Sequence, residues 1–203
     1  MKYIKFKSFI DKTIALFTLI VISPILISIY FCILFKLGKP VFFLQERPGY
    51  KSRGFKIIKF RTMLNSNNDS TSNETDENRL TELGIFLRKY SLDELPELIN
   101  IIRGEMSFVG PRPLLMQYLN LYTPEQLKRH DVLPGITGYA QINGRNLLSW
   151  EEKFKYDLIY VEKQSFIFDL MVLIKTFLVV IFKKGISAKG EATMYAFRGN
   201  QEK

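Results

Sequence analysis

The sequence predicts a mainly α-helical protein with one small β-hairpin, attached to a membrane by a segment near its N-terminus. Three observations support this fold class. Residues 13–35 form an apolar run without a charged side chain, two short aromatic and β-branched runs flank a loop with proline and glycine, and two later segments open with capping boxes. In a chain of 203 residues with a single cysteine, Cys32, we expect one folded domain that needs no disulfides.

The apolar run, "TIALFTLIVISPILISIYFCILF", is long enough to cross a membrane as a helix. At about 1.5 Å per residue it reaches roughly 35 Å, against about 30 Å for the hydrocarbon core of a bilayer. Pro24 removes one helical hydrogen bond and predicts a bend, where Ser23 can bond the carbonyl of Leu19. A kinked span and a re-entrant hairpin with both ends in the cytoplasm are both compatible with this pattern.

The formal net charge of +9 indicates an anionic partner. Lysines precede and follow the apolar run, as expected where a segment meets anionic phospholipid headgroups. The same charge could serve nucleic acid, whose phosphates also reward clustered lysine and arginine. The position of the lysines favours the membrane, and we expect no nucleic-acid partner.

Two short strands are predicted next. "VFFLQ" and "FKIIKF" lie on either side of "ERPGYKSRG", which is typical of a hairpin or of two irregular strands. The polar segment 64–78 that follows is poor in apolar residues, and we expect it to be a mobile loop that could act as a lid.

The segment "SLDELPEL", residues 91–98, allows two interpretations. Ser91 and Glu94 have the spacing of a capping box, in which each side chain binds the other's backbone at a helix start. However, Glu94 alone would complete the box, so Asp93 is surplus, and Pro96 makes a regular helix start strained. The two carboxylates are therefore either caps or part of a reactive site.

Helices dominate the rest of the chain. Thr123 with Gln126, and Ser149 with Glu152, predict helix starts at these positions. Between them, the loops "GEMSFVGPRPLL" and "LPGITGYAQINGRN" carry Arg112 and Arg145. Such loops are either plain structural turns or places where backbone N–H groups and arginines bind phosphate.

The last apolar segment, residues 166–182, contains Asp169 and Lys175 and is a poor candidate for a span. Its apolar residues follow helical spacing on one stripe, so we expect an amphipathic helix lying on the membrane or against the core. His130 is the only histidine. Any catalytic metal would therefore need oxygen ligands, which beside phosphates indicates Mg²⁺.

Taken together, "SLDELPELIN", "RGEMSFVGPRPLL", "LPGITGYAQINGRN", "FKIIKFRTM" and the Ser-Pro pair resemble the bacterial sugar transferase family, the small monotopic phosphoglycosyl transferases. The resemblance covers nearly the whole chain. Its tail, "GISAKGEATMYAFRGN", resembles members that act on acetylated amino sugars such as diacetylbacillosamine.

This resemblance implies transfer of a sugar 1-phosphate from a UDP-sugar to undecaprenyl phosphate, with release of UMP, at the cytoplasmic face of the bacterial inner membrane. It implies that residues 1–38 form a re-entrant helix broken at Ser23-Pro24, and that residues 39–203 form a compact cytosolic catalytic domain packed on the membrane surface.

The family's motif also implies residue roles. Asp93 would be the nucleophile, with Glu94 beside it helping to hold Mg²⁺. The candidate substrate-binding residues are Arg88, Arg112, Arg145, Lys59, Arg61 and Asp169. Two other hypotheses for the function stay open. One is a transferase that forms a ternary complex without a covalent intermediate, and the other is a non-catalytic basic membrane-bound adaptor.

Overall fold

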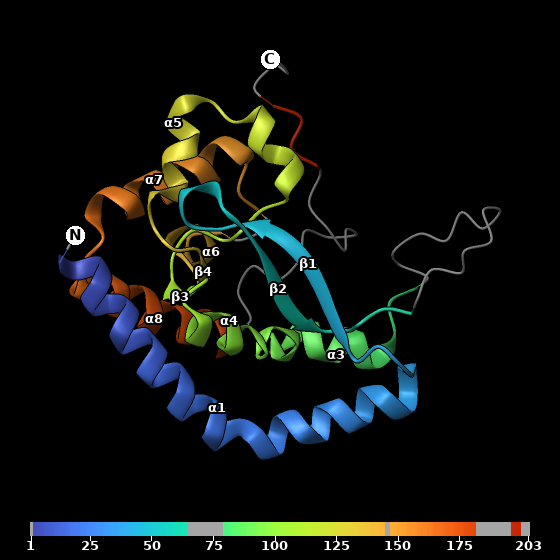
Figure 1. Cartoon of the computed structure of the whole chain (residues 1–203). Helices are drawn as coiled ribbons and strands as arrows, with labels where there is room; N and C mark the ends of the chain where they lie inside the picture. Colours follow the sequence, from blue (N-terminus) through green and yellow to red (C-terminus); the bar gives the residue numbers. More distant parts are fainter. Residues whose placement is uncertain (1, 65–78, 145–146, 182–195, 200–203) are drawn as a thin grey trace.

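Helices make up most of the described chain and two small sheets complete it, which confirms the predicted fold class in outline (Figure 1). The computed structural model describes residues 2–64, 79–144, 147–181 and 196–199. The longer elements are α1 (Lys2–Leu37), β1 (Phe42–Pro48), β2 (Gly54–Phe60), α3 (Glu82–Lys89), α4 (Glu97–Arg103), α7 (Trp150–Lys163) and α8 (Phe166–Ile181). The shorter ones are η1 (Tyr50–Ser52), η2 (Leu92–Glu94), β3 (Ser107–Val109), η3 (Met116–Leu121), α5 (Pro124–Leu127), η4 (Lys128–Asp131), β4 (Gly135–Thr137) and α6 (Tyr139–Ile142).

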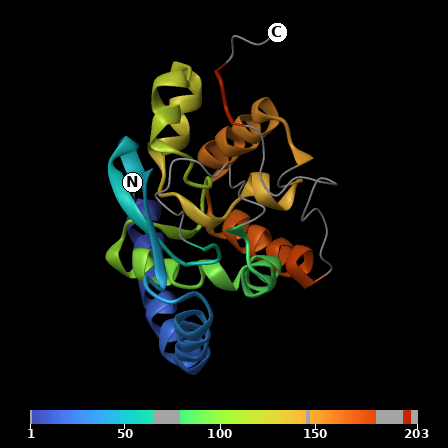
Figure 2. The same ribbon diagram turned by 90° about the vertical axis from the view of Figure 1, so that its right-hand side faces the viewer.

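Helix α1 lies at one end of the molecule and changes direction near its middle (Figures 1 and 2). Pro24 lies inside it and cannot donate a hydrogen bond to the carbonyl of Ile20. The hydroxyl of Ser23 donates to that carbonyl instead, at 2.8 Å. The predicted acceptor, the carbonyl of Leu19, was therefore wrong by one residue. The bond to Ile20 partly replaces the one that proline removes. Among the described helices, α1 is the one that is long and apolar enough to cross a membrane.

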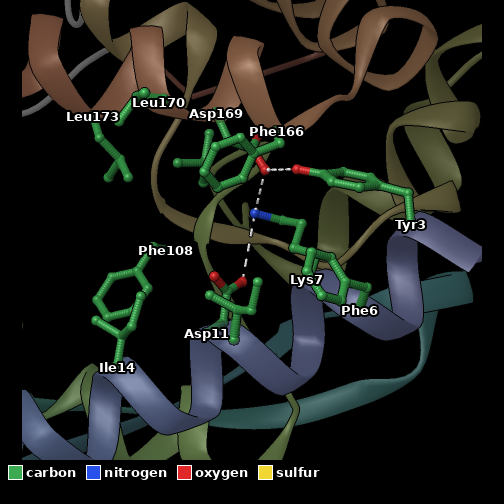
Figure 3. A pocket seen from close by; sticks show the side chains of 12 residues that line it. Tyr3, Phe6, Lys7, Asp11, Ile14, Phe108, Phe166, Asp169, Leu170 and Leu173 are labelled. Carbon is green, nitrogen blue, oxygen red and sulfur yellow. Dashed lines mark hydrogen bonds and ion pairs between the residues drawn. The ribbon is translucent and has the colours of Figure 1, made fainter.

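Both ends of α1 are tied to the rest of the protein. Near its start, Lys7 forms an ion pair of 2.6 Å with Asp169 of α8 (Figure 3). Asp11 accepts a 2.6 Å hydrogen bond from Ser107. At its other end, Arg61 donates to the carbonyls of Leu37, Gly38 and Lys39. These carbonyls belong to the last turn and the residues after it, where backbone acceptors lack helical partners.

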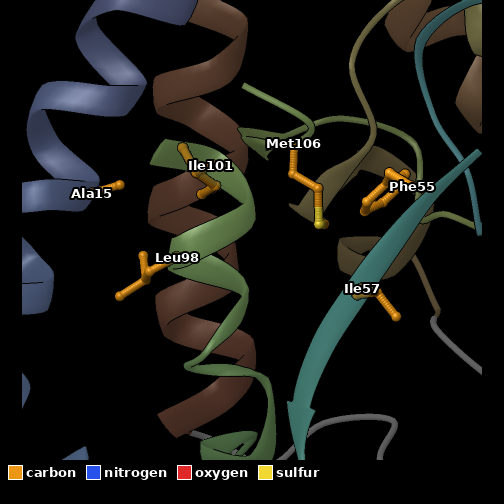
Figure 4. Packing of buried hydrophobic residues seen from close by; sticks show 6 residues of the cluster. All are labelled: Ala15, Phe55, Ile57, Leu98, Ile101 and Met106. Atoms are coloured by element: carbon orange, nitrogen blue, oxygen red, sulfur yellow. The ribbon is translucent and has the colours of Figure 1, made fainter. Parts of the chain in front are cut away.

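The predicted hairpin is confirmed. Strands β1 and β2 pair antiparallel from Phe42 opposite Phe60 to Pro48 opposite Gly54. Helix α4 lies between this hairpin and α1, and the three elements share a core that Figure 4 shows in close-up. The core residues are Ala15, Phe55, Ile57, Leu98, Ile101 and Met106.

The two glycine- and proline-rich loops pack on each other. Strands β3 and β4 pair in parallel, with Ser107 opposite Gly135 and Val109 opposite Thr137. Gly110 follows β3, where a side-chain carbon would lie 2.3 Å from the carbonyl oxygen of Leu133. Only glycine fits this approach, which fixes the chain immediately before Arg112.

Both predicted capping boxes are present, at Thr123 with Gln126 and at Ser149 with Glu152. They start α5 and α7, at the end of the molecule opposite α1 (Figures 1 and 2). An aromatic cluster holds this end together, formed by Tyr118, Tyr122, Trp150, Phe154 and Phe197.

Apolar side chains cover the outer faces of α1 and α8. Phe35 of α1 is 82% exposed and Ile167 of α8 is 79% exposed. The apolar stripe predicted on α8 faces outward, while Asp169 and Val172 of the same helix are buried. An exposed apolar surface of this kind marks a membrane or protein contact. The outer face of α8 is therefore placed for such a contact, while its inner face contributes Val172 to the core.

Candidate active site

The segment "SLDELPEL" does not form a capping box. Ser91 lies in the left-handed region, at φ 54°, and its side chain makes no capping hydrogen bond. Asp93 and Glu94 form a single 3₁₀ turn, η2, and helix α4 starts afresh after Pro96. A non-glycine residue at positive φ costs about 1–3 kcal/mol, and such strain is concentrated at functional sites. The backbone therefore presents the two carboxylates by a strained turn in place of a regular helix start.

Glu94 is held by two cations. Its Oε1 lies 2.7 Å from Nζ of Lys59 and 2.5 Å from Nη2 of Arg112. Burial would raise the pKa of Glu94, but the charges and hydrogen bonds of Arg112 and Lys59 lower it far below the ordinary value. Glu94 is therefore ionised at neutral pH, and its second oxygen, Oε2, has only a long 3.5 Å contact to Arg112.

Asp93 is placed differently. Within the described ranges, its carboxylate makes no hydrogen bond or ion pair. Burial raises the pKa of Asp93, and the neighbouring charge of Glu94 raises it further, while Lys59, Arg112 and Arg88 oppose the shift. A half-buried carboxylate without a partner, beside three cations, is suited to react with an anionic group that those cations attract.

Three of the predicted substrate-binding residues meet at this site from three parts of the fold. Lys59 comes from β2, Arg88 from the last turn of α3, and Arg112 from the loop after β3. Arg88 is oriented by a 3.0 Å hydrogen bond from its Nε to Oγ1 of Thr62. Their charges all act on Asp93, so the structure brings together residues that are far apart in the sequence.

The other three do not join this cluster in the part of the chain that the structure describes. Arg61 binds the end of α1, and Asp169 binds Tyr3, Lys7 and Tyr160. These contacts give both residues a role in attaching α1. Arg145 lies outside the described residues, as does most of the polar segment 64–78.

Three further charged residues lie near the site and were not predicted. Glu97 is 1% exposed, and its Oε1 lies 3.1 Å from Nζ of Lys59. Burial and the charge of Glu94 raise the pKa of Glu97 to about 7, against the opposing charge of Lys59. Burial and the charge of Arg112 lower the pKa of Arg47, and they lower that of Lys153 to about 8. Glu97 stands in the motif itself, but nothing in the local sequence places Arg47 or Lys153 near Arg112.

A buried ion pair supports Arg112 from behind. Arg129 and Asp157 are each 3% exposed, and Nη2 of Arg129 lies 2.7 Å from Oδ2 of Asp157. The same Nη2 donates a 2.8 Å hydrogen bond to the backbone carbonyl of Arg112. The guanidinium of Arg129 also lies over the rings of Tyr122 and Phe154.

His130 lies beside this pair and should make stability depend on pH. Burial, together with the charge of Arg129, lowers the pKa of His130 to about 4. In the unfolded chain the imidazole of His130 has its ordinary pKa of about 6.5, so it takes up a proton at a higher pH than in the folded protein. The folded protein therefore has its full stability above about pH 6.5 and loses this contribution as pH falls towards 4. The shift corresponds to about 3 kcal/mol.

We expect the melting temperature of the detergent-solubilised protein to fall between pH 6.5 and 4, and to fall less in His130→Gln. Thermal unfolding of both proteins over this range is the measurement. Equal slopes for the two proteins would contradict the assignment, because the carboxylates that also titrate there are common to both.

The carboxylates fit a magnesium ion only if phosphate supplies other ligands. Within the described ranges, no group of three or more histidine, cysteine, aspartate or glutamate side chains could hold a metal. Mg²⁺ commonly takes one or two carboxylates together with substrate phosphates and water. Asp93 and Oε2 of Glu94 match that reduced requirement.

Comparison with known proteins points to one family. The model of the bacterial sugar transferase family matches residues 2–183. The chain is 46% identical over 194 residues to the uncharacterized sugar transferase EpsL of Bacillus subtilis (strain 168), which covers 96% of both chains. It is 36% identical over 192 residues to the exopolysaccharide production protein ExoY of Rhizobium meliloti (strain 1021), covering 86% of this chain and 85% of the relative.

A larger relative is named for its activity. The chain is 40% identical over 177 residues to UDP-glucose:undecaprenyl-phosphate glucose-1-phosphate transferase of Escherichia coli (strain K12). This similarity covers 82% of the chain but 38% of the relative, so it concerns one part of a longer protein.

Proposed function

Because the chain belongs to the bacterial sugar transferase family, we propose that it transfers a sugar 1-phosphate from a UDP-sugar to undecaprenyl phosphate, releasing UMP. The names of relatives that use a UDP-sugar and a lipid carrier support both substrates. The observation that carries the proposal is the unpaired carboxylate of Asp93 beside Lys59, Arg88 and Arg112.

We propose that the first step is covalent capture by Asp93. A carboxylate oxygen of Asp93 attacks the phosphorus that bears the sugar, the bridging P–O bond of the diphosphate breaks, and UMP leaves with that bridging oxygen. In the second step, a phosphate oxygen of undecaprenyl phosphate attacks the same phosphorus. The bond to Asp93 breaks, its carboxylate is restored, and the product is a lipid-linked diphosphate sugar.

Lys59, Arg88 and Arg112, here called the cation cluster, are suited to bind the negatively charged diphosphate of the donor. Arg47 and Lys153 have lowered pKa values partly because the charge of Arg112 repels theirs, and a bound diphosphate would relieve that repulsion. Phosphoryl transfer depends mainly on positioning and on neutralising the transferring group. The network Glu97–Lys59–Glu94–Arg112, which is buried at Glu97 and reaches the surface at Arg112, holds two of the required cations in place before substrate arrives.

For magnesium, Asp93 and Oε2 of Glu94 would provide the protein ligands. When bound, the ion would neutralise diphosphate charge. The protein's own contribution is the orientation of Glu94, whose other oxygen is occupied by Lys59 and Arg112.

We propose an acetylated amino sugar, such as diacetylbacillosamine, as the sugar transferred. This rests on the sequence of the C-terminal tail, most of which lies outside the described residues. The names of two relatives specify glucose and galactose, so a panel of UDP-sugars must include both.

We expect repeated turnover, with many UMP molecules released per protein, only when both a UDP-sugar and undecaprenyl phosphate are present. We expect EDTA to abolish this turnover and added Mg²⁺ to restore it. The measurement is UMP formation by the protein in detergent over the panel of donors. Turnover that survives chelation would remove the metal from the proposal. Failure of every donor would favour the non-catalytic membrane adaptor.

We also propose that α1 is re-entrant and that the site faces the cytoplasm at the inner membrane. The support is that both ends of α1 are tied to one folded body, through Lys7 and Asp11 at one end and through Arg61 at the other. The acceptor phosphate stays in the headgroup plane, so a shallow anchor would keep Asp93 at that depth.

In a Cys32→Ser background, we expect Lys12→Cys and Lys36→Cys both to react with a membrane-impermeant maleimide from the cytoplasmic side alone. Inverted vesicles and spheroplasts give the two orientations. Labelling of the two positions from opposite sides would establish a span and overturn the re-entrant topology.

A further inference from the structure

An apolar groove adjoins the candidate site and has no part in the chemistry described above. It has a volume of about 360 Å³, within the range of about 300–1,000 Å³ that is typical of small-molecule sites. Its walls come from the second half of α1, from the hairpin and from the start of α4, and none of its lining side chains is charged. The main contributors are Leu26, Tyr30, Phe42, Phe60, Pro96 and Ile99.

The groove lies directly behind the carboxylates. Lys59 and Phe60 are neighbours on β2, and successive side chains of a strand point to opposite faces. Lys59 pairs with Glu94, while Phe60 lines the groove and packs in one core cluster with Leu92, the residue before Asp93. A single strand therefore separates the charged site from the apolar groove.

The groove is also connected to the membrane helix. Phe31 and Ile27 of α1 line it and are 47% and 56% exposed, so it opens on the surface that α1 presents to its surroundings. Figure 1 shows this second half of α1 passing beneath α3 and α4. A chain bound here could have one end in the bilayer and the other at Asp93.

We propose that this groove binds the isoprenoid units of the polyprenyl phosphate acceptor that lie next to its phosphate. The proposal rests on the proposed function, because it needs that acceptor. The aromatic lining, with the rings of Phe42 and Phe60 stacked at 5.4 Å and Tyr30 at 6.0 Å from Phe42, offers flat apolar surfaces to branched isoprene units. With its isoprenoid chain in this groove, the acceptor would present its phosphate to Asp93 from the membrane side. The diphosphate of the UDP-sugar would bind on the other side, at the cation cluster.

Filling the groove tests this. We expect Leu26→Trp and Ile99→Phe each to lower kcat/KM for undecaprenyl phosphate by about tenfold or more, the effect of displacing a few buried methylene groups. The capture of phosphosugar from UDP-sugar without any lipid should stay within about twofold, since that step does not use the groove. Leu173→Trp is the matched control, because Leu173 lines a different apolar cavity, beside α8, and this variant should behave as the wild type.

Unchanged kcat/KM for the acceptor in both groove variants would overturn the proposal. If the wild-type protein captures no phosphosugar from any UDP-sugar in the absence of lipid, the proposed function itself is wrong. The two failures are therefore distinguishable.

A second measurement does not depend on the variants' folding. A diazirine-bearing polyprenyl phosphate should label the peptides that contain Tyr30 and Ile99 in the wild-type protein, and excess undecaprenyl phosphate should prevent it. Equal protection by phosphatidylglycerol would show that the groove holds any lipid chain, and would overturn the assignment to the acceptor.

Discussion

Asp93→Asn is expected to abolish transfer of the sugar phosphate, lowering the rate of UMP release by at least about 10³-fold, as removal of a covalent nucleophile commonly does. Asparagine keeps the size of the side chain but lacks the anionic oxygen that attacks phosphorus. Because Asp93 has no hydrogen-bond or ion-pair partner in the described residues, the substitution should leave the fold intact. UMP formation measured with saturating donor and acceptor is the test.

The control for this variant is Asp131→Asn. Asp131 is an exposed carboxylate that pairs with Lys51 at the surface, at 2.6 Å, and should not affect turnover. Both variants should fractionate with membranes as the wild type does. Turnover of Asp93→Asn near the wild-type rate would remove the nucleophile assignment.

Arg129→Met is expected to have the largest effect on stability. It leaves Asp157 buried and unpaired, which typically costs about 3–5 kcal/mol, and removes the hydrogen bond to the carbonyl of Arg112. Burial already raises the pKa of Asp157 against the charge of Arg129, so the carboxylate depends on that cation to remain ionised. For a chain of this size the melting temperature should fall by about 10 °C or more.

The double variant Arg129→Met/Asp157→Leu separates a lost ion pair from a lost contact. It removes both charges, and an apolar replacement of a buried pair is often nearly neutral, so most of the melting temperature should return. Transfer activity should not return fully, since the carbonyl of Arg112 still lacks its donor. Lys51→Ala, which breaks the exposed pair with Asp131, should change the melting temperature little. An Arg129→Met melting temperature equal to that of the wild type would contradict the role of this pair.

Local patterns predicted the elements of this fold well. The capping boxes at Thr123 and Ser149 were confirmed because their hydrogen bonds join residues only three positions apart. The box at Ser91 was not formed, because Ser91 lies in the left-handed region and not in the extended conformation of an N-cap residue. Pro96 then separates η2 from α4, which starts anew. Sequence spacing alone could not choose between these outcomes, since both begin from the same four residues.

The site was predictable only in part. Asp93, Glu94 and Arg112 stand in motifs, but which cations meet them depends on contacts across the fold, as with Lys59 from β2 and Arg88 from α3. Arg61 shows the opposite case, since the family resemblance implied a substrate contact and the side chain in this structure binds the end of α1. Arg129 and Asp157 carried no local signal, because a buried pair between residues 28 positions apart is visible only in three dimensions.

The central claim is that Asp93 takes the phosphosugar as a covalent intermediate, and the mass of the intact protein tests it most directly. After incubation with the UDP-sugar donor in the absence of lipid, the wild-type protein should gain the mass of one phosphosugar and lose it when undecaprenyl phosphate is added, while Asp93→Asn should gain nothing. A protein that turns over without ever gaining this mass, or an Asp93→Asn variant that gains it, would contradict the claim; the former result would favour direct transfer within a ternary complex.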